Sequence, residues 1–151
     1  MNFLLDTNVI SEWIKPNPDP GVVAWLAEVD EDRTYISVVT IAELRHGIER
    51  MVPGRRQKRL NEWIREDLVS RFEDRILPID DAVAESWGKV MARCETAGRS
   101  MSAMDAFIAA TAEFNGLTLI TRNVSDFACS VASTLNPWSE GSDLPRSKQE
   151  N

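Results

Sequence analysis

The sequence has very few of the side chains that bind zinc or form nucleophile–base pairs. His46 is the single histidine, and Cys94 and Cys129 are the two cysteines, with no CxxC spacing. A zinc site would therefore have almost no ligands to use. A Ser-His-Asp triad would depend on His46, which lies within a predicted helix and is expected on its surface. The chain also has neither common form of glycine-rich phosphate-binding loop.

Long apolar runs and secretion signals are also missing. The apolar stretches are too short to span a bilayer. The N-terminal residues 1–6 have no basic start and carry an aspartate within their apolar part, so they do not form a signal peptide. We therefore expect a cytoplasmic protein without membrane contact, in which both cysteines are reduced and buried.

Acidic residues outnumber basic ones, 24 to 17, and the basic residues are concentrated in one region. The net charge of −7 argues against a generally adhesive surface for nucleic acid. Between residues 45 and 59, six basic residues accompany one acid, Glu49. The six are Arg45, Arg50, Arg55, Arg56, Lys58 and Arg59. They form either a solvated helix end and loop or a strip that faces RNA phosphates, with the last four as the candidate contacts.

The alternation of short apolar runs with amphipathic segments predicts an α/β fold, with a short central parallel sheet of four to five strands flanked by helices. Strands are predicted at 2–5, 34–39, 75–79, 117–121 and 131–135. Main helices are predicted at 41–51, 60–68, 83–98 and 102–116. The length suits one domain, expected over residues 1–138. The polar tail 139–151 has no periodicity and is expected to be disordered.

Four acidic residues stand where this chain turns at strand ends or helix starts. Asp6 ends the first apolar run, Glu43 follows the second strand, Asp105 opens a helix of small residues, and Asp126 follows the fourth strand. The carboxyl ends of parallel strands share one edge, so we expect these acids to converge there. The expectation is least direct for Asp105, whose helix precedes its strand. Clustered carboxylates indicate a hard divalent cation, Mg²⁺ or Mn²⁺.

Each acid also has a local structural explanation. The segments 40–43 and 102–105 match capping boxes. Asp126 could cap a turn, and Asp6 could form a turn with Thr7 and Asn8. Four separate coincidences are a weaker explanation than one shared site. Without a protein nucleophile, the chemistry that remains is metal-assisted hydrolysis, which suits a phosphodiester.

Several short motifs, in this order and spacing, resemble a PIN domain. They are Asp6-Thr7-Asn8 after the first strand, Thr40-x-x-Glu43-Leu44, Ile108-Ala109-Ala110 on the Asp105 helix, and Thr121-Arg122-Asn123 followed by Asp126-Phe127. The closing Asn136-Pro137-Trp138 is similar to the VapC and FitB branch of bacterial toxins. The resemblance covers residues 1–138.

This resemblance implies a metal-dependent endoribonuclease that is the toxin of a type II toxin–antitoxin pair. It implies an RNA substrate, with tRNA as one candidate, a homodimer, and a small VapB-like antitoxin whose tail fills the active site. It also implies Asp6, Glu43 and Asp105 as the core acidic set. Asp6 and Asp105 are expected to bind the metal directly, and Glu43 to bind it or to orient the attacking water.

One position departs from the family pattern. Many members carry an acid where this chain has Asn123. Either Asp126 supplies the fourth carboxylate, or the second metal is weakly bound. Asn123 can still form a hydrogen bond to metal-bound water. Thr7, Asn8 and Thr121 are further auxiliary candidates, although the two threonines could equally bond the backbone at strand ends.

Two rival interpretations belong to other functional classes. In the first, the protein is a non-catalytic regulatory module whose acidic pocket only docks a basic antitoxin peptide. In the second, it is a phosphatase that uses Asp6 as its nucleophile. That class, by resemblance, requires a second aspartate two residues later, where this chain has Asn8.

Overall fold

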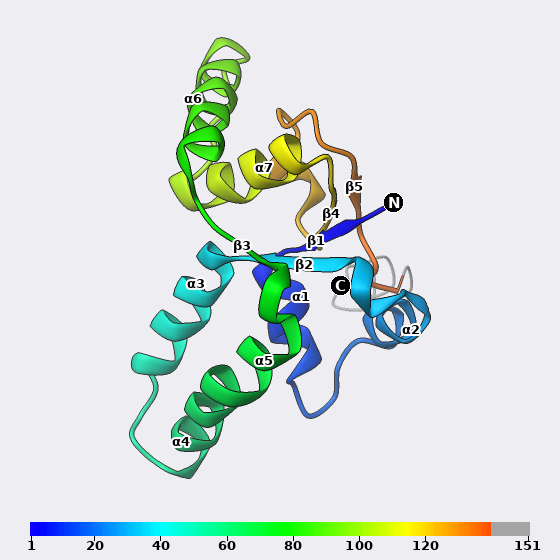
Figure 1. Ribbon diagram of the computed structural model, residues 1–151, viewed down its shortest axis with the longest axis vertical. Coiled ribbons are helices and arrows are strands. Elements are labelled where there is room, and N and C mark those ends of the chain that lie inside the picture. The colour runs from blue at the N-terminus through cyan, green and yellow to red at the C-terminus, as the bar shows by residue number, and fades with distance from the viewer. Residues whose placement is uncertain (140–151) are drawn as a thin grey trace, which may run out of the picture.

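A central parallel sheet organises the computed structural model, which describes residues 1–139. In this part of the chain five strands, β1 (Phe3–Leu5), β2 (Thr34–Ser37), β3 (Ile76–Leu77), β4 (Thr118–Ile120) and β5 (Thr134–Leu135), pair in the order β3-β2-β1-β4-β5 (Figure 1). All four pairings are parallel. The predicted α/β class is therefore confirmed. The tail expected to be disordered lies outside the described residues from position 140 onward.

Helices cover both faces of this sheet (Figure 1). On one face lie α1 (Thr7–Trp13), α2 (Pro20–Glu28), α3 (Val38–Glu49), α4 (Arg55–Glu62), a π-helical turn (Trp63–Leu68) and α5 (Val69–Phe72). On the other lie α6 (Asp81–Thr96) and α7 (Ala103–Asn115). Short 3-10 turns occupy Glu31–Arg33, Glu73–Arg75 and Val124–Phe127 (η4). None of the helices in this part of the chain is both long and apolar enough to cross a membrane.

The core is split by the sheet into two apolar clusters. Leu4 and Leu119 belong to the cluster with α6 and α7, whereas Leu5 and Ile120 belong to the cluster with the helices of the other face. Neighbouring residues of a strand point to opposite faces, so β1 and β4 each contribute side chains to both clusters. Sequences of continuous apolar residues are expected for strands that are buried on both sides.

The start of α3 corrects one predicted boundary. We expected a strand to Val39 and a helix from residue 41, but the helix begins at Val38. Ser37 is its N-cap, and its Oγ accepts a hydrogen bond of 3.0 Å from the backbone N–H of Val39. The two valines look like strand residues because they are β-branched. Thr40 therefore lies within the helix, and no capping box forms between Thr40 and Glu43.

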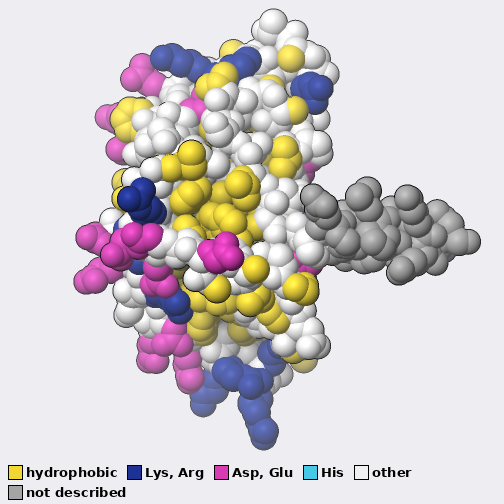
Figure 2. Space-filling model, turned by 90° about the vertical axis from the view of Figure 1, so that its right-hand side faces the viewer, with side chains coloured by type: hydrophobic (Ala, Val, Ile, Leu, Met, Phe, Trp, Pro, Cys, Tyr) yellow, Lys and Arg dark blue, Asp and Glu magenta, His cyan; other side chains and the backbone are white. Residues whose placement is uncertain are grey.

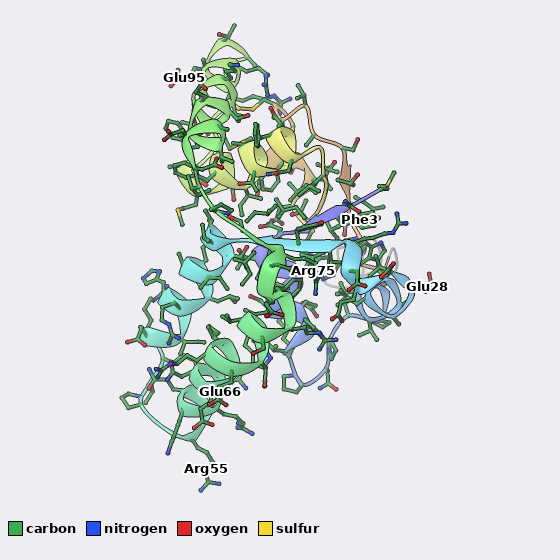
Figure 3. The ribbon with its side chains drawn as sticks, in the orientation of Figure 1. Phe3, Glu28, Arg55, Glu66, Arg75 and Glu95 are labelled. Atoms are coloured by element: carbon green, nitrogen blue, oxygen red, sulfur yellow. A yellow bond between two sulfur atoms is a disulfide. The ribbon has the colours of Figure 1, made fainter. Side chains whose placement is uncertain are left out.

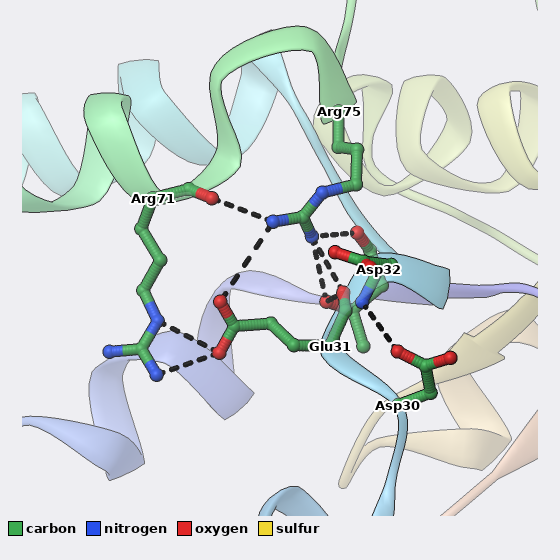
Figure 4. Close-up of polar contacts among 6 residues, drawn as sticks. Asp30, Glu31, Asp32, Arg71 and Arg75 are labelled. Carbon is green, nitrogen blue, oxygen red and sulfur yellow. Dashed lines mark hydrogen bonds and ion pairs between the residues drawn. The ribbon is translucent and has the colours of Figure 1, made fainter.

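An arginine pair fastens α5 to the amino end of β2 (Figure 4). Arg71 donates to Glu31 Oε1 from Nε at 3.0 Å and from Nη2 at 2.7 Å. Arg75 donates to the carbonyl of Thr34 at 2.6 Å and to the carbonyl of Arg71 at 2.6 Å. The acidic turn 30–32 thus stabilises the edge of the sheet where the strands begin. This edge lies opposite to the one that carries the strands' carboxyl ends.

A disulfide overturns the expectation of reduced cysteines. Cys94, near the end of α6, is bonded to Cys129, just after η4, with Cα atoms 5.5 Å apart. Cys94 is buried, as predicted, and Cys129 packs partly buried against the same apolar cluster. The prediction failed because it rested on the expected compartment, whereas pairing depends on a distance between segments that the sequence did not reveal.

We predict that reducing this disulfide destabilises the protein without unfolding it. A bridge that closes a loop of 35 residues contributes roughly 3–4 kcal/mol by restricting the unfolded chain. Urea unfolding of the wild type with and without reductant measures the loss. A Cys94→Ala/Cys129→Ala protein should match the reduced wild type and ignore the reductant. Equal midpoints for oxidised and reduced wild type would contradict the prediction.

Candidate active site at the sheet switch point

The site lies where the direction of strand addition reverses. The chain proceeds from β1 to β2 and β3 on one side, while β4 and β5 add on the other side of β1. Asp6 directly follows β1 and Thr121 directly follows β4. The backbone N–H of Asp6 donates to the carbonyl of Ile120 at 2.9 Å. Ligands of parallel α/β sheets bind outside the strands' carboxyl ends at such a point.

Both oxygens of the Asp6 carboxylate have protein donors. Thr121 Oγ1 donates to Oδ2 at 2.8 Å, and the backbone N–H of Thr7 donates to Oδ1 at 2.8 Å. Asp6 is the N-cap of α1, and its side chain is 6% exposed. Asp6 thus has a local structural role as a helix N-cap, not in the turn that we considered, and it also lines the pocket.

The first turns of α3 bring Glu43 to the same place. Thr7 Oγ1 donates to Glu43 Oε1 and lies 3.0 Å from Thr40 Oγ1. Thr7 thereby connects the segment after β1 with the helix after β2. Its hydroxyl fixes the orientation of the Glu43 carboxylate instead of bonding the backbone.

Asp105 reaches the site because of the direction of α7. This helix leads back into β4, so it runs antiparallel to the strands and begins at their carboxyl edge. Ser102 is its N-cap, and Ser102 Oγ accepts from the backbone N–H of Asp105 at 3.1 Å. The capping interpretation thus holds for Ser102, while the carboxyl group of Asp105 lines the pocket.

The converging segments enclose an open pocket of about 450 Å³. Six predicted site residues line it, namely Asp6, Thr7, Asn8, Glu43, Asp105 and Asn123. Thr121 is fully buried beneath it. Asp126 is exposed on η4 and does not line the pocket, although its charge acts on Asp105. Of the two residues considered for the fourth position, Asn123 lines the pocket and Asp126 does not.

Burial and mutual repulsion raise the pKa values of two of these acids. Burial raises the pKa of Asp6 to about 6, with further contributions from the charges of Asp105 and Glu43, against the opposing hydrogen bonds from Thr121 and Thr7. Burial also raises the pKa of Asp105, helped by the charges of Asp126 and Glu43 and opposed by a hydrogen bond from Ser102. Carboxylates that repel each other in this way favour a cation between them.

The donor set of the pocket suits a hard cation. Asn8 Nδ2 lies 3.4 Å from Thr121 Oγ1, but Asn8 Oδ1 is buried and has no hydrogen-bond partner in the described part of the chain. Within residues 1–139, no three His, Cys, Asp or Glu side chains are placed to hold a metal by themselves. Mg²⁺ typically uses one or two carboxylates with water and substrate phosphates, so it does not need such a cluster.

Comparison with known proteins agrees with this geometry. The family model that describes PIN domains matches residues 3–128 of this chain. The chain belongs to the PIN domain family. It is 38% identical to "Toxin FitB" of Neisseria gonorrhoeae over 136 residues, which cover 90% of this chain and 98% of FitB. It is 32% identical to the "tRNA(fMet)-specific endonuclease VapC" of Shigella flexneri over 128 residues, 84% of this chain and 90% of that protein.

The structure of FitAcB from Neisseria gonorrhoeae is similar as well, with a TM-score of 0.86 and 38% sequence identity. The match covers 90% of this chain and 98% of the FitAcB chain. The resemblance to PIN domains of the VapC and FitB type, inferred from short motifs, is therefore confirmed. The roles of the individual site residues stay predictions.

Sequence reasoning missed several residues of this PIN-domain pocket. Ser11, Glu12, Lys15, Arg122 and Trp138 also line it. A signal was present for three of them, because Asn8, Ser11 and Glu12 on α1 and Lys15 just after it follow one another at helical spacing. Burial alone would raise the pKa of Glu12, but hydrogen bonds from Lys15 and the backbone N–H of Asp19 lower it.

None of the six basic residues between positions 45 and 59 lines the pocket. Arg55, Arg56, Lys58 and Arg59 are exposed on α4, a separate helix, and not on a turn after the Glu43 helix as we expected. Figure 3 places Arg55 at the opposite end of the molecule from Glu95. Arg45 instead contacts Asn61 and Glu49. Figure 2 shows that basic side chains gather near both ends of one face, with acidic ones along its side.

We predict that Asp6→Asn stabilises the metal-free protein at neutral pH. The folded-state pKa of Asp6, about 6, exceeds its ordinary value of 3.8. Its ionisation therefore lowers stability as the pH rises through about 6. Removing the charge should raise the free energy of unfolding by up to about 3 kcal/mol at pH 7.5 and by much less at pH 4.

Urea unfolding in EDTA at the two pH values measures this difference. Asp32→Asn, at an exposed position outside the pocket, is the matched control and should change little. A destabilised Asp6→Asn protein at pH 7.5 would show instead that the N-cap and Thr121 contacts outweigh the repulsion.

Proposed function

We propose that this PIN domain is a divalent-metal-dependent endoribonuclease, the toxin of a toxin–antitoxin pair that acts in the cytoplasm. The observation that carries the proposal is the meeting of Asp6, Glu43 and Asp105 in one pocket at the sheet switch point. The names of the VapC and FitB relatives support the same activity, and the VapC name makes tRNA a candidate substrate.

In this proposal Asp6 and Asp105 hold Mg²⁺ or Mn²⁺, and Asn8 Oδ1 is available as a neutral oxygen donor. The cation, when bound, neutralises charge on the phosphodiester and lowers the pKa of water. Glu43, whose carboxylate is fixed by Thr7, binds the cation or orients the attacking water. Thr121 orients Asp6, and Asn123 and Asp126 complete the outer shell of the site.

The same pocket also suits a basic segment of an antitoxin. Carboxylates without a cation attract a guanidinium group, which can bond them in a bidentate manner. We propose that a small VapB-like antitoxin inserts such a segment, and that the toxin is a homodimer. If the protein were only a docking module, an antitoxin would bind but purified protein would leave RNA intact.

We predict that Asp105→Asn abolishes RNA cleavage and leaves the fold intact. The substitution removes a metal ligand and relieves repulsion, so the free energy of unfolding should stay level or rise. Cleavage of total cellular RNA by purified protein measures the activity, and thermal unfolding measures the fold. Asp81→Asn, in the first turn of α6 and outside the pocket, should cleave like the wild type. A folded Asp105→Asn protein with near wild-type cleavage would refute the assignment.

We further predict that cleavage depends on Mg²⁺ or Mn²⁺ and that Zn²⁺ does not replace them. Oxygen ligands favour hard cations, and the pocket lining includes no histidine or cysteine among the described residues. Activity measured after EDTA treatment and after addition of each cation tests this. Undiminished cleavage in excess EDTA would contradict it.

For the basic residues of α4, we predict that Arg55→Glu/Arg56→Glu weakens RNA binding and leaves single-turnover cleavage at saturating RNA unchanged. Binding with fewer phosphate contacts releases fewer counterions, so the salt dependence of binding should also flatten. Fluorescence anisotropy at several salt concentrations measures both quantities. The control Lys89→Glu/Arg99→Glu reverses two exposed charges elsewhere. If the wild type and the double variant bind RNA with equal affinity and equal salt dependence, Arg55 and Arg56 belong to a solvated face that does not contact RNA.

A further inference from the structure

Two basic side chains belong to the lining of the acidic pocket. Among the described residues that line it, these are Lys15, just after α1, and Arg122, just after β4. An anionic RNA strand that enters a pocket of carboxylates meets repulsion, which only local positive charge or a cation can offset. Lys15 and Arg122 come from different segments, so the question is what holds each of them there.

Lys15 is held by a buried acid. Its Nζ donates to Glu12 Oε1 at 2.9 Å, and Glu12 is 6% exposed. The other carboxylate oxygen, Oε2, accepts from the backbone N–H of Asp19 at 2.8 Å. A buried carboxylate is costly unless it is paired and hydrogen-bonded, and both conditions are met here. An ammonium group has three donors, so Lys15 retains donors beyond the one that Glu12 uses.

Arg122 is held by the last described residues of the chain. Its guanidinium lies 5.5 Å from the ring centroid of Trp138, which is 6% exposed and also lines the pocket. The next residue is tied down by Asp19, because Ser139 donates from N to Oδ2 at 2.9 Å and from Oγ to Oδ1 at 3.1 Å.

Asp19 therefore contacts both of the groups that hold the basic residues in place. Its backbone N–H bonds Glu12, and its side chain bonds Ser139. The neighbouring Gly21 permits this close approach, since a Cβ there would meet Ser139 N at 2.4 Å and Pro137 O at 2.5 Å. The contacts between the start of α2 and residues 137–139 thus help to set the positions of two basic side chains, Lys15 and Arg122, in one pocket.

We infer that Lys15 and Arg122 bind the phosphates of the RNA strand beside the acidic cluster, and that Asp19 is the positioning residue for both. The inference rests on the proposed nuclease function and names how that site takes its substrate. Lys15 carries a point charge and Arg122 a planar, delocalised one, and both attract phosphate oxygens. The ligand is the sugar–phosphate backbone of a single strand.

The test uses the full chain with Asp105→Asn to prevent cleavage, and a labelled single-stranded RNA of random sequence. Lys15→Gln and Arg122→Gln should each weaken binding about five- to tenfold and lower the slope of log K against log salt by about 0.7. Lys15→Arg and Arg122→Lys should largely restore the slope. Lys89→Gln and Arg99→Gln, at exposed positions outside the pocket, should change neither quantity.

Asp19→Ala removes the side-chain bonds to Ser139 and keeps the backbone N–H that bonds Glu12, so it should weaken binding about as much as Arg122→Gln does, which a residue that serves only stability would not do in folded protein. Thermal unfolding identifies the folded variants. Unchanged affinity and slope in folded Lys15→Gln and Arg122→Gln proteins would overturn the inference. Wild-type protein is assayed for cleavage of the same RNA in parallel. Absence of cleavage would count against the proposed function, while the binding data would still decide the phosphate contacts.

Discussion

The carboxylate of Asp6, held between the ends of β1 and β4, is the constraint on which the site depends. It is buried, accepts from Thr121 and from the backbone of Thr7, and starts α1. A carboxylate in this place is poorly solvated and is repelled by Glu43 and Asp105, which raises its pKa to about 6. The site therefore holds unfavourable charge, and a bound cation is the simplest way to relieve it.

The rest of the fold supplies neighbours to this carboxylate. Parallel strands place Asp6 and Thr121 side by side, the helix after β2 supplies Glu43, and the antiparallel run of α7 supplies Asp105. On another side, Glu12 and Asp19 connect α1 and α2 with residues 137–139 and hold Lys15 and Trp138. Lys15 and Arg122 thus follow the same strand-end segments as Asp6 and Thr121, but they are supported by Asp19 and residues 137–139.

Much of this arrangement could be predicted from the sequence, because it follows from general topology. A short apolar run that ends in Asp6 indicates a strand end, and parallel strands must share an edge. Boundaries were harder, since Val38 and Val39 favour a strand in isolation while the cap of Ser37 makes them helical. The disulfide and the contact of residues 137–139 with Asp19 could not be predicted, because they join segments that no local pattern relates.

Diffraction from Mn²⁺-soaked crystals, with the anomalous signal of the metal, is the most direct test of a cation at the Asp6 carboxylate. An anomalous peak is expected in the pocket beside the carboxylate oxygens of Asp6 and Asp105, and its loss is expected in crystals of the Asp6→Asn protein. Anomalous peaks only elsewhere on the molecule, at saturating Mn²⁺, would contradict a cation site at the Asp6 carboxylate.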